Sequence, residues 1–222
     1  MKRSLTMSWL IIAAFTMFSF QTFAKEFKGV ITYKITIEGS GVTEEMKTMM
    51  PKTMVMTIKG NKVRSEMVMS MGKTISISDG DTKTATMLMD MMGQKFAIQS
   101  TTEEIMKEIA DAPESKVEIT SETKEICGYT CKKAIITNAE EGTELTVYFT
   151  DELGSNALNF DNPQFKDING AMLEFEMPYG GEFNMHMTAV TVEKKNVDDS
   201  EFAIPEGYQI KTKEELKGMF GG

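Results

Sequence analysis

The chain has 222 residues, of which 21 are methionine, two are cysteine and one is histidine, and its formal net charge at pH 7 is −9. An acidic chain with scattered lysines is a poor candidate for binding nucleic acid or anionic headgroups through a basic patch. One histidine leaves little room for Ser-His-acid or Cys-His catalysis, and the chain has no Gly-x-Ser-x-Gly motif and no Gly-rich phosphate loop. We therefore expect neither catalysis nor a cofactor.

The first 24 residues have the three parts of a secretory signal peptide: a positively charged start, an apolar run over residues 9–20 and the small residue Ala24. The apolar run is about a dozen residues, whereas a membrane-spanning helix needs roughly 20. This favours cleavage after Ala24 over retention as an anchor, and no cysteine follows the run to carry a lipid. We expect residues 25–222 to form a single β-rich domain that is periplasmic or secreted, not an integral membrane protein.

Most of the remaining chain alternates apolar and polar side chains, which is the pattern of half-buried strands. The alternating segments lie at 33–37, 54–58, 63–71, 75–77, 87–91, 96–98, 116–122, 130–138, 144–150, 171–177 and 185–194. Turn residues such as Gly60-Asn61 separate many of them at intervals near ten residues, which suggests an antiparallel meander.

Two stretches interrupt the alternation. Residues 101–110 begin with threonines that can cap a helix, continue with acids in the first turn and carry an apolar stripe that ends at Ile109, and Pro113 follows. They predict one short helix packed against the sheet. Residues 151–170 are rich in Gly, Asn, Asp and Pro and are interpreted as a long loop.

Methionines follow the strand alternation, and residues two apart share one face of a strand. The candidate ligand-binding methionines are Met54, Met56, Met67, Met69, Met71, Met87 and Met89. Three explanations remain open. Methionine can replace Leu and Val as a filler of the core, or it can line a pliable face that accepts an apolar ligand or a partner's apolar segment. Thioethers also bind Cu(I).

The copper alternative would use Met67, Met69, Met87 and Met89 together with His186. In an extended strand, however, His186 points away from its two methionine neighbours, so the Met-His-Met tripeptide alone does not build a site.

Arg64 is a charged residue among apolar neighbours and a candidate ligand contact. Alternation places it on the face of Glu66, opposite Val63 and Met67, which favours a cross-strand pair over a contact with a ligand's acidic group.

Cys127 and Cys131 are a disulfide candidate in an exported protein. Residues four apart on a straight strand are separated by about 13 Å, whereas a disulfide requires Cα atoms within roughly 7 Å. The bond therefore needs a tight turn at Gly128-Tyr129-Thr130, and both states remain open.

Several segments resemble exported bacterial proteins of the family called domain of unknown function 4412. They are residues 60–67, the Gly-Tyr-x-Cys segment within 124–134, residues 147–151 and the stretch 202–208. The Gly-Tyr-x-Cys segment is also similar to the family named for its Gly-Leu-Pro-Gly-Leu-Ile motif. The first resemblance implies a curved antiparallel sheet, or half-barrel, like that of periplasmic lipoprotein carriers, with Cys131 where the family often has a cysteine. It implies no known activity and no catalytic residue.

We therefore expect a mainly β fold, a curved antiparallel sheet with one short helix against it. The favoured hypothesis is an exported, non-catalytic protein that binds an apolar or lipid-like ligand, or a segment of an envelope protein, on a methionine-rich concave face. A periplasmic copper-handling protein and a structural or interaction domain of the cell envelope are the alternatives.

Overall fold

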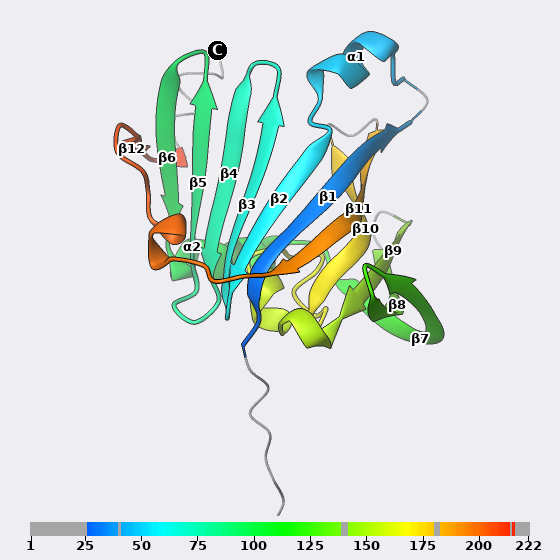
Figure 1. Ribbon diagram of the computed structural model, residues 1–222. Coiled ribbons are helices and arrows are strands. Elements are labelled where there is room, and N and C mark those ends of the chain that lie inside the picture. The colour runs from blue at the N-terminus through cyan, green and yellow to red at the C-terminus, as the bar shows by residue number, and fades with distance from the viewer. Residues whose placement is uncertain (1–25, 40, 139–141, 180–182, 214, 216–222) are drawn as a thin grey trace, which may run out of the picture.

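The computed structural model describes residues 26–39, 41–138, 142–179, 183–213 and 215, so the predicted signal peptide lies outside the described residues. Twelve strands within these ranges form one curved sheet in the order β12-β6-β5-β4-β3-β2-β1-β11-β10-β9-β8-β7 (Figure 1). All pairs are antiparallel except β12–β6. The predicted curved antiparallel sheet is confirmed.

The strands are β1 (Lys28–Glu38), β2 (Thr53–Lys59), β3 (Lys62–Met69), β4 (Gly72–Asp79), β5 (Thr84–Met91), β6 (Gln94–Ser100), β7 (Ser115–Ile126), β8 (Tyr129–Asn138), β9 (Thr143–Thr150), β10 (Ala171–Tyr179), β11 (Phe183–Lys194) and β12 (Gln209–Lys211). The helices are α1 (Glu44–Met49) and α2 (Thr102–Asp111), with short 3₁₀ helices at Asp151–Leu153, Asn156–Asn159 and Asp199–Phe202. None of the described helices has the length and apolar character needed to cross a membrane.

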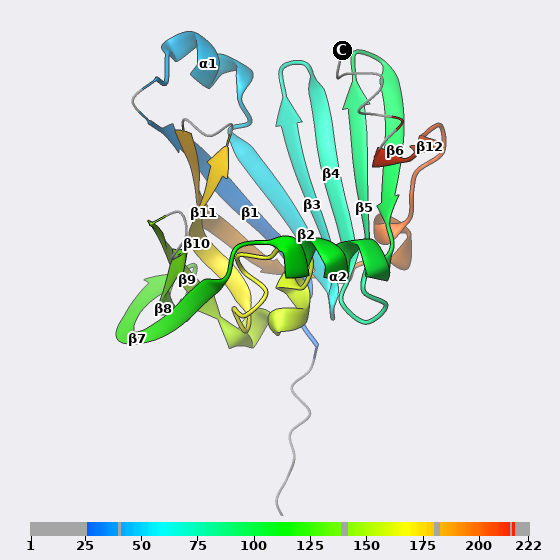
Figure 2. The ribbon, with the colours of Figure 1, turned by 180° about the vertical axis from the view of Figure 1, so that it is seen from behind.

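The predicted helix is α2, and a capping box begins it. The Thr101 hydroxyl accepts a hydrogen bond from the Glu104 backbone N–H at 3.3 Å, and the Glu104 carboxylate accepts one from the Thr101 N–H at 2.7 Å. The helix buries Ile105 and lies on one side of the curved sheet (Figure 2). The six-residue α1, which the alternation does not predict, begins after Thr43 and buries no side chain.

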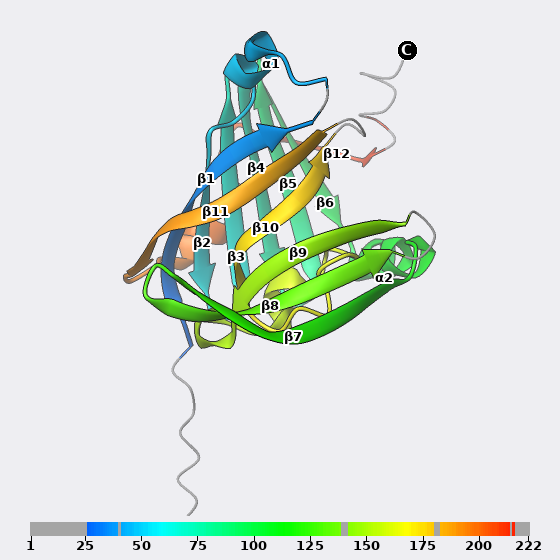
Figure 3. The same cartoon turned by 90° about the vertical axis from the view of Figure 1, so that its right-hand side faces the viewer.

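We call the sheet face that carries Tyr33 the inner face. Tyr33 is buried there, donates a hydrogen bond to the Met172 carbonyl oxygen at 2.8 Å and meets Phe175 edge to face at 5.9 Å. Phe165 contacts the same Phe175 ring, also edge to face at 5.9 Å. Residues 151–170, predicted as a loop, therefore pack into the principal core, inside the curve of β7–β11 (Figure 3).

A buried amide organises this inner segment. The Asn159 side-chain NH₂ donates to the Ile168 carbonyl oxygen at 2.9 Å and to the Gly170 carbonyl oxygen at 3.0 Å. Without the Asn159 amide, both carbonyl groups would be buried without this hydrogen-bond donor. This one side chain therefore connects the segment to the residue before β10.

Asp161 lies in the same segment, and its burial raises the pKa of its carboxyl group above the usual value. Folding therefore disfavours the ionised carboxylate, which lowers the stability of the folded protein. This loss of stability is complete above the pKa of Asp161 in the folded state, and it vanishes below the pKa in the unfolded state, about 3.9. We expect Asp161→Asn to raise the melting temperature at pH 7 and to lose that advantage as the pH falls toward 3. Thermal unfolding across this pH range measures the difference, and a constant difference would contradict it.

A second, smaller core lies on the outer face of β4–β6. It consists of Ile75, Ile77, Leu88 and Ala97, which are covered by Phe202, Ile204 and Tyr208. The covering residues belong to the segment between β11 and β12, residues 195–208, which we call the strap (Figure 1). Asp199 of the strap forms ion pairs with Lys59 of β2 at 2.8 Å and with Lys62 of β3 at 3.7 Å.

Candidate functional site

The register of β1–β6 determines which side chains share the inner face, because directly opposed residues point to the same side of a sheet. One row from β1 to β6 contains Tyr33, Met54, Met67, Thr74, Met89 and Phe96. The adjacent row contains Ile31, Met56, Ser65, Ser76, Met87 and Ile98. A third, nearer the β3–β4 turn, places Met69 and Met91 on either side of Gly72.

The structure thus brings the predicted methionines of β2, β3 and β5 onto one face, while Met71 lies in the turn between β3 and β4. Their burial differs. Met54 is 5% exposed and belongs to the principal core, whereas Met87 is 45% exposed although it lies within a strand. Met56, Met67, Met69 and Met89 are half-buried. Core filling therefore explains Met54 but not Met87.

Small residues occupy the inner positions of β4, between the methionines of β3 and β5. They are Gly72, Thr74, Ser76 and Ser78. Because neighbouring strands are about 4.8 Å apart, the two methionine-bearing strands are separated by roughly 10 Å. No residue in the inner rows of β2–β5 is ionisable. The face is therefore apolar at its sides, weakly polar along its middle and uncharged.

Arg64 lies on the opposite, outer face. Its Nη2 atom is 2.5 Å from the Glu66 Oε2 atom, and Lys73 Nζ is 3.7 Å from the other oxygen of the same carboxylate. The ion pair of Arg64 lies within β3 and is not the expected cross-strand pair, and the structure does not place Arg64 beside the methionines as a ligand contact. Strand alternation is the physical reason, because residues at odd separation point to opposite faces.

His186 is also on the outer face and is separated from the methionines of the copper alternative. Its Nδ1 atom is 3.4 Å from Glu176 Oε1, and its Nε2 atom is 4.0 Å from Glu174 Oε1. Its neighbours Met185 and Met187 point inward and are buried. Within the part of the chain that the structure describes, no group of three or more His, Cys, Asp or Glu residues is arranged to hold a metal ion.

The two cysteines are free thiols, so the candidate disulfide is not formed. Cys127 and Gly128 form the two-residue turn between β7 and β8, and the Cys127 thiol donates to the Ala189 carbonyl oxygen at 3.4 Å. Cys131 is buried on β8, where burial and the nearby Glu125 charge raise the pKa of its thiol to about 11. Burial also raises the pKa of Cys127. Neither is an activated nucleophile.

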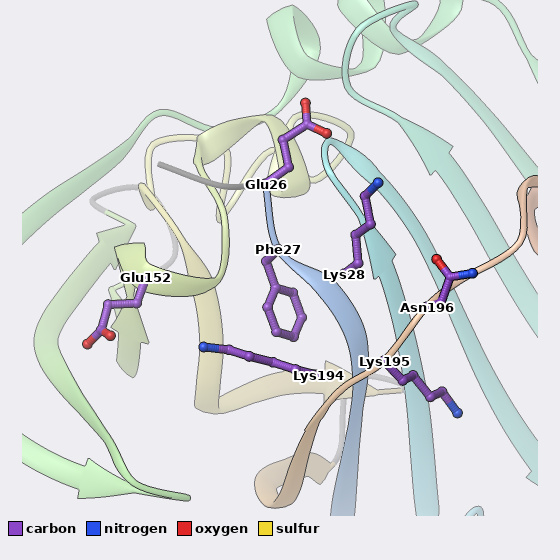
Figure 4. A pocket seen from close by; sticks show the side chains of 7 residues that line it. All are labelled: Glu26, Phe27, Lys28, Glu152, Lys194, Lys195 and Asn196. Atoms are coloured by element: carbon purple, nitrogen blue, oxygen red, sulfur yellow. The ribbon is translucent and has the colours of Figure 1, made fainter. Parts of the chain in front are cut away.

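A pocket of about 480 Å³ lies where β1 begins and β11 ends. It is lined by Glu26, Phe27, Lys28, Glu152, Lys194, Lys195 and Asn196. Figure 4 shows that Lys194 extends to one side of Phe27, whereas Lys28 and Lys195 point away on the other side. The ammonium groups do not converge on one position, so this pocket is a weaker candidate than the inner face.

A sequence model of the family described as domain of unknown function (DUF4412) matches residues 27–168. The chain belongs to this family, as the segment 60–67 and the Gly-Tyr-x-Cys segment suggested. No curated protein matches the chain.

Two of the solved structures that match the chain differ in their likeness to it. One, described as the structure of PNGF-II in C2 space group, has 18% identity and a TM-score of 0.53 over 86% of this chain, which spans about a third (32%) of that chain. The other is the LolA superfamily protein NE2245 from Nitrosomonas europaea, with 7% identity and a TM-score of 0.33 over 81% of this chain and 91% of that chain. The first likeness supports the fold, whereas the second TM-score is too low to support an argument.

Proposed function

We propose that this protein binds a neutral, chain-like apolar ligand on the inner face of β2–β6 and catalyses no reaction. The observation that carries the proposal is the exposed, uncharged methionine face itself. Met87 is 45% exposed in the middle of a strand, and half-buried methionines surround it on β3 and β5. Covering this surface with a ligand would remove apolar area from water at about 25 cal/mol per Å².

The shape of the face favours an unbranched ligand. The row of small side chains on β4 runs from Gly72 to Ser78, which is roughly 20 Å along the strand at about 3.3 Å per residue. A single extended chain fits lengthwise between the methionines of β3 and β5, whose flexible thioether side chains adjust to its contour. The absence of ionisable residues from the inner rows of β2–β5 supports a non-catalytic role and a ligand that is neutral where it contacts the face.

The place of action in this proposal is the periplasm or the exterior, and residues 25–222 are one domain. The support is the predicted signal peptide of residues 1–24. Mass spectrometry of the exported protein would test it, because cleavage after Ala24 makes Lys25 the first residue.

Filling the middle of the face is expected to abolish binding. Ser76→Phe places an aromatic ring on the inner side of β4, between Ser65 and Met87. We expect its affinity for a fluorescent unbranched fatty acid to fall at least tenfold, measured by fluorescence titration after endogenous lipid has been extracted.

The matched control is Gln99→Phe, which adds the same ring at an exposed position on the outer face of β6. It should bind as the wild type does, and the melting temperatures of both variants should show that they are folded. A wild type that does not bind the probe, or a folded Ser76→Phe variant that binds it equally well, would refute the proposed function.

A further inference from the structure

Exposed apolar side chains gather at one end of the sheet, where α1 and the β3–β4 and β5–β6 turns meet. They are Met49 (45% exposed), Val68 (60%), Met71 (55%) and Met92 (83%), and we call this group the methionine rim. Both hairpin tips project from the same end of the sheet (Figures 1 and 2). Ser70 donates a hydrogen bond to the Met49 carbonyl oxygen at 3.4 Å, and the Met92 N–H donates to the Met71 carbonyl oxygen at 3.3 Å. These bonds join the three elements into one surface.

Met92 occupies an unusual position for its residue type. With Gly93 it forms the two-residue turn between β5 and β6, and the φ angles of both residues are positive, at 53° and 81°. Gly is preferred at the first position of such a turn because it lacks a β-carbon, and Asn and Asp because their short polar side chains can hydrogen-bond locally, whereas a longer apolar side chain is strained there. Neither the backbone nor the solvent favours methionine at this position, which points to a contact outside the chain.

Charges beside the rim are balanced, although the whole chain has a net charge of −9. Lys47 pairs with Glu44 at 2.7 Å, and Lys95 lies 3.8 Å from Asp90. Lys73 likewise lies 3.7 Å from Glu66. Beside the exposed methionines, the acidic side chains are thus paired with lysines. The surroundings of the rim are therefore compatible with a surface that carries both signs of charge, as zwitterionic lipid headgroups do.

We propose that the methionine rim inserts into the interfacial layer of a lipid bilayer. Met71 and Met92 lie on the two projecting hairpin turns, with Met49 of α1 and Val68 of β3 beside them, so these apolar side chains can enter the headgroup layer together. The inner row of Met69, Gly72 and Met91 lies next to the same turns. The proposed ligand-binding face therefore extends as far as the methionine rim. Membrane contact goes beyond the proposed ligand binding and does not depend on it.

Co-sedimentation with phosphatidylcholine vesicles tests the proposal on the exported protein. The wild type should sediment with the vesicles, and the double variant Met71→Ser/Met92→Asn should partition at least tenfold more weakly. Because Asn is preferred at the first position of this turn, Met92→Asn should not impair folding. The control is Met106→Ser on α2, which removes a methionine of similar exposure, 54%, at the other end of the sheet (Figure 2). It should sediment as the wild type does.

A wild type that stays in solution, or a double variant that sediments equally, would overturn the proposal. Loss of a dimer in the double variant without any vesicle binding by the wild type would instead assign the rim to a second copy of the chain. Ser76→Phe separates this proposal from ligand binding, because it should lose the fatty acid and still sediment with vesicles. Vesicle binding without fatty-acid binding would refute only the proposed function.

Discussion

Replacement of Phe165 by alanine is expected to lower the free energy of unfolding by about 3–5 kcal/mol. Phe165 is 1% exposed and packs edge to face against Phe175, whose ring also contacts Tyr33. The substitution would leave a cavity where residues 151–170 meet the inner face. It removes both the apolar burial and the ring contact that hold this segment in place.

Urea denaturation followed by circular dichroism measures the loss. Phe202→Ala is a suitable comparison because Phe202 is half-buried on the strap, in the separate outer core. Its loss should be smaller, about 1–2 kcal/mol, since less apolar area is removed from the core. A loss below about 1 kcal/mol for Phe165→Ala would contradict a structural role for the inner segment.

Asn159→Asp should destabilise the protein by about 3–5 kcal/mol at pH 7, because two buried carbonyl groups lose their donor and face a carboxylate. The two acceptors are the carbonyl oxygens of Ile168 and Gly170. The new carboxyl group would have a raised pKa in the folded state, since its neighbours accept hydrogen bonds and cannot donate them. The electrostatic part of its destabilisation is therefore full above the folded pKa, shrinks as the pH falls from that pKa toward the unfolded value of about 3.9, and is gone below that value.

Chemical denaturation at pH 7 and at pH 4 gives the two values. Asn156→Asp provides the control, because this exposed asparagine begins the same 3₁₀ helix and its side chain makes no comparable buried contact. The control should change stability by less than about 0.5 kcal/mol at either pH. Equal effects of the two substitutions would show that the Asn159 amide does not hold the segment.

The strands and α2 can be predicted from the sequence because the patterns that specify them involve residues close together in the chain. Apolar alternation reports which residues share a face, and it correctly separates Arg64 and His186 from the methionines beside them. The capping box of Thr101 and Glu104 likewise lies within one turn of the helix that it begins. The alternation also places the methionines of β3 and β5 on a common face, although β4 lies between these strands.

What covers each face depends on contacts between residues far apart in the chain, which alternation does not encode. Phe165 and Ile168 have no strand or helix period, yet both are buried against the inner face. The strap covers Ile75 and Leu88 from more than a hundred residues further along the sequence. Alternation therefore does not predict that Met87 on the inner side of β5 remains exposed while Leu88 on its outer side is buried.

The strap has a consequence for how far the inner face can vary. The large buried apolar side chains of β4 and β5 point to the outer face, beneath Phe202, Ile204 and Tyr208, whereas β6 also buries Phe96 and Ile98 on the inner face. The inner side chains of β4 and β5 therefore contribute less than the outer ones to holding the sheet together. Replacement of the exposed Met87 by another apolar residue is therefore expected to change stability little. In the proposed function, β4 and β5 would thus hold the sheet together through one face and contact the ligand through the other.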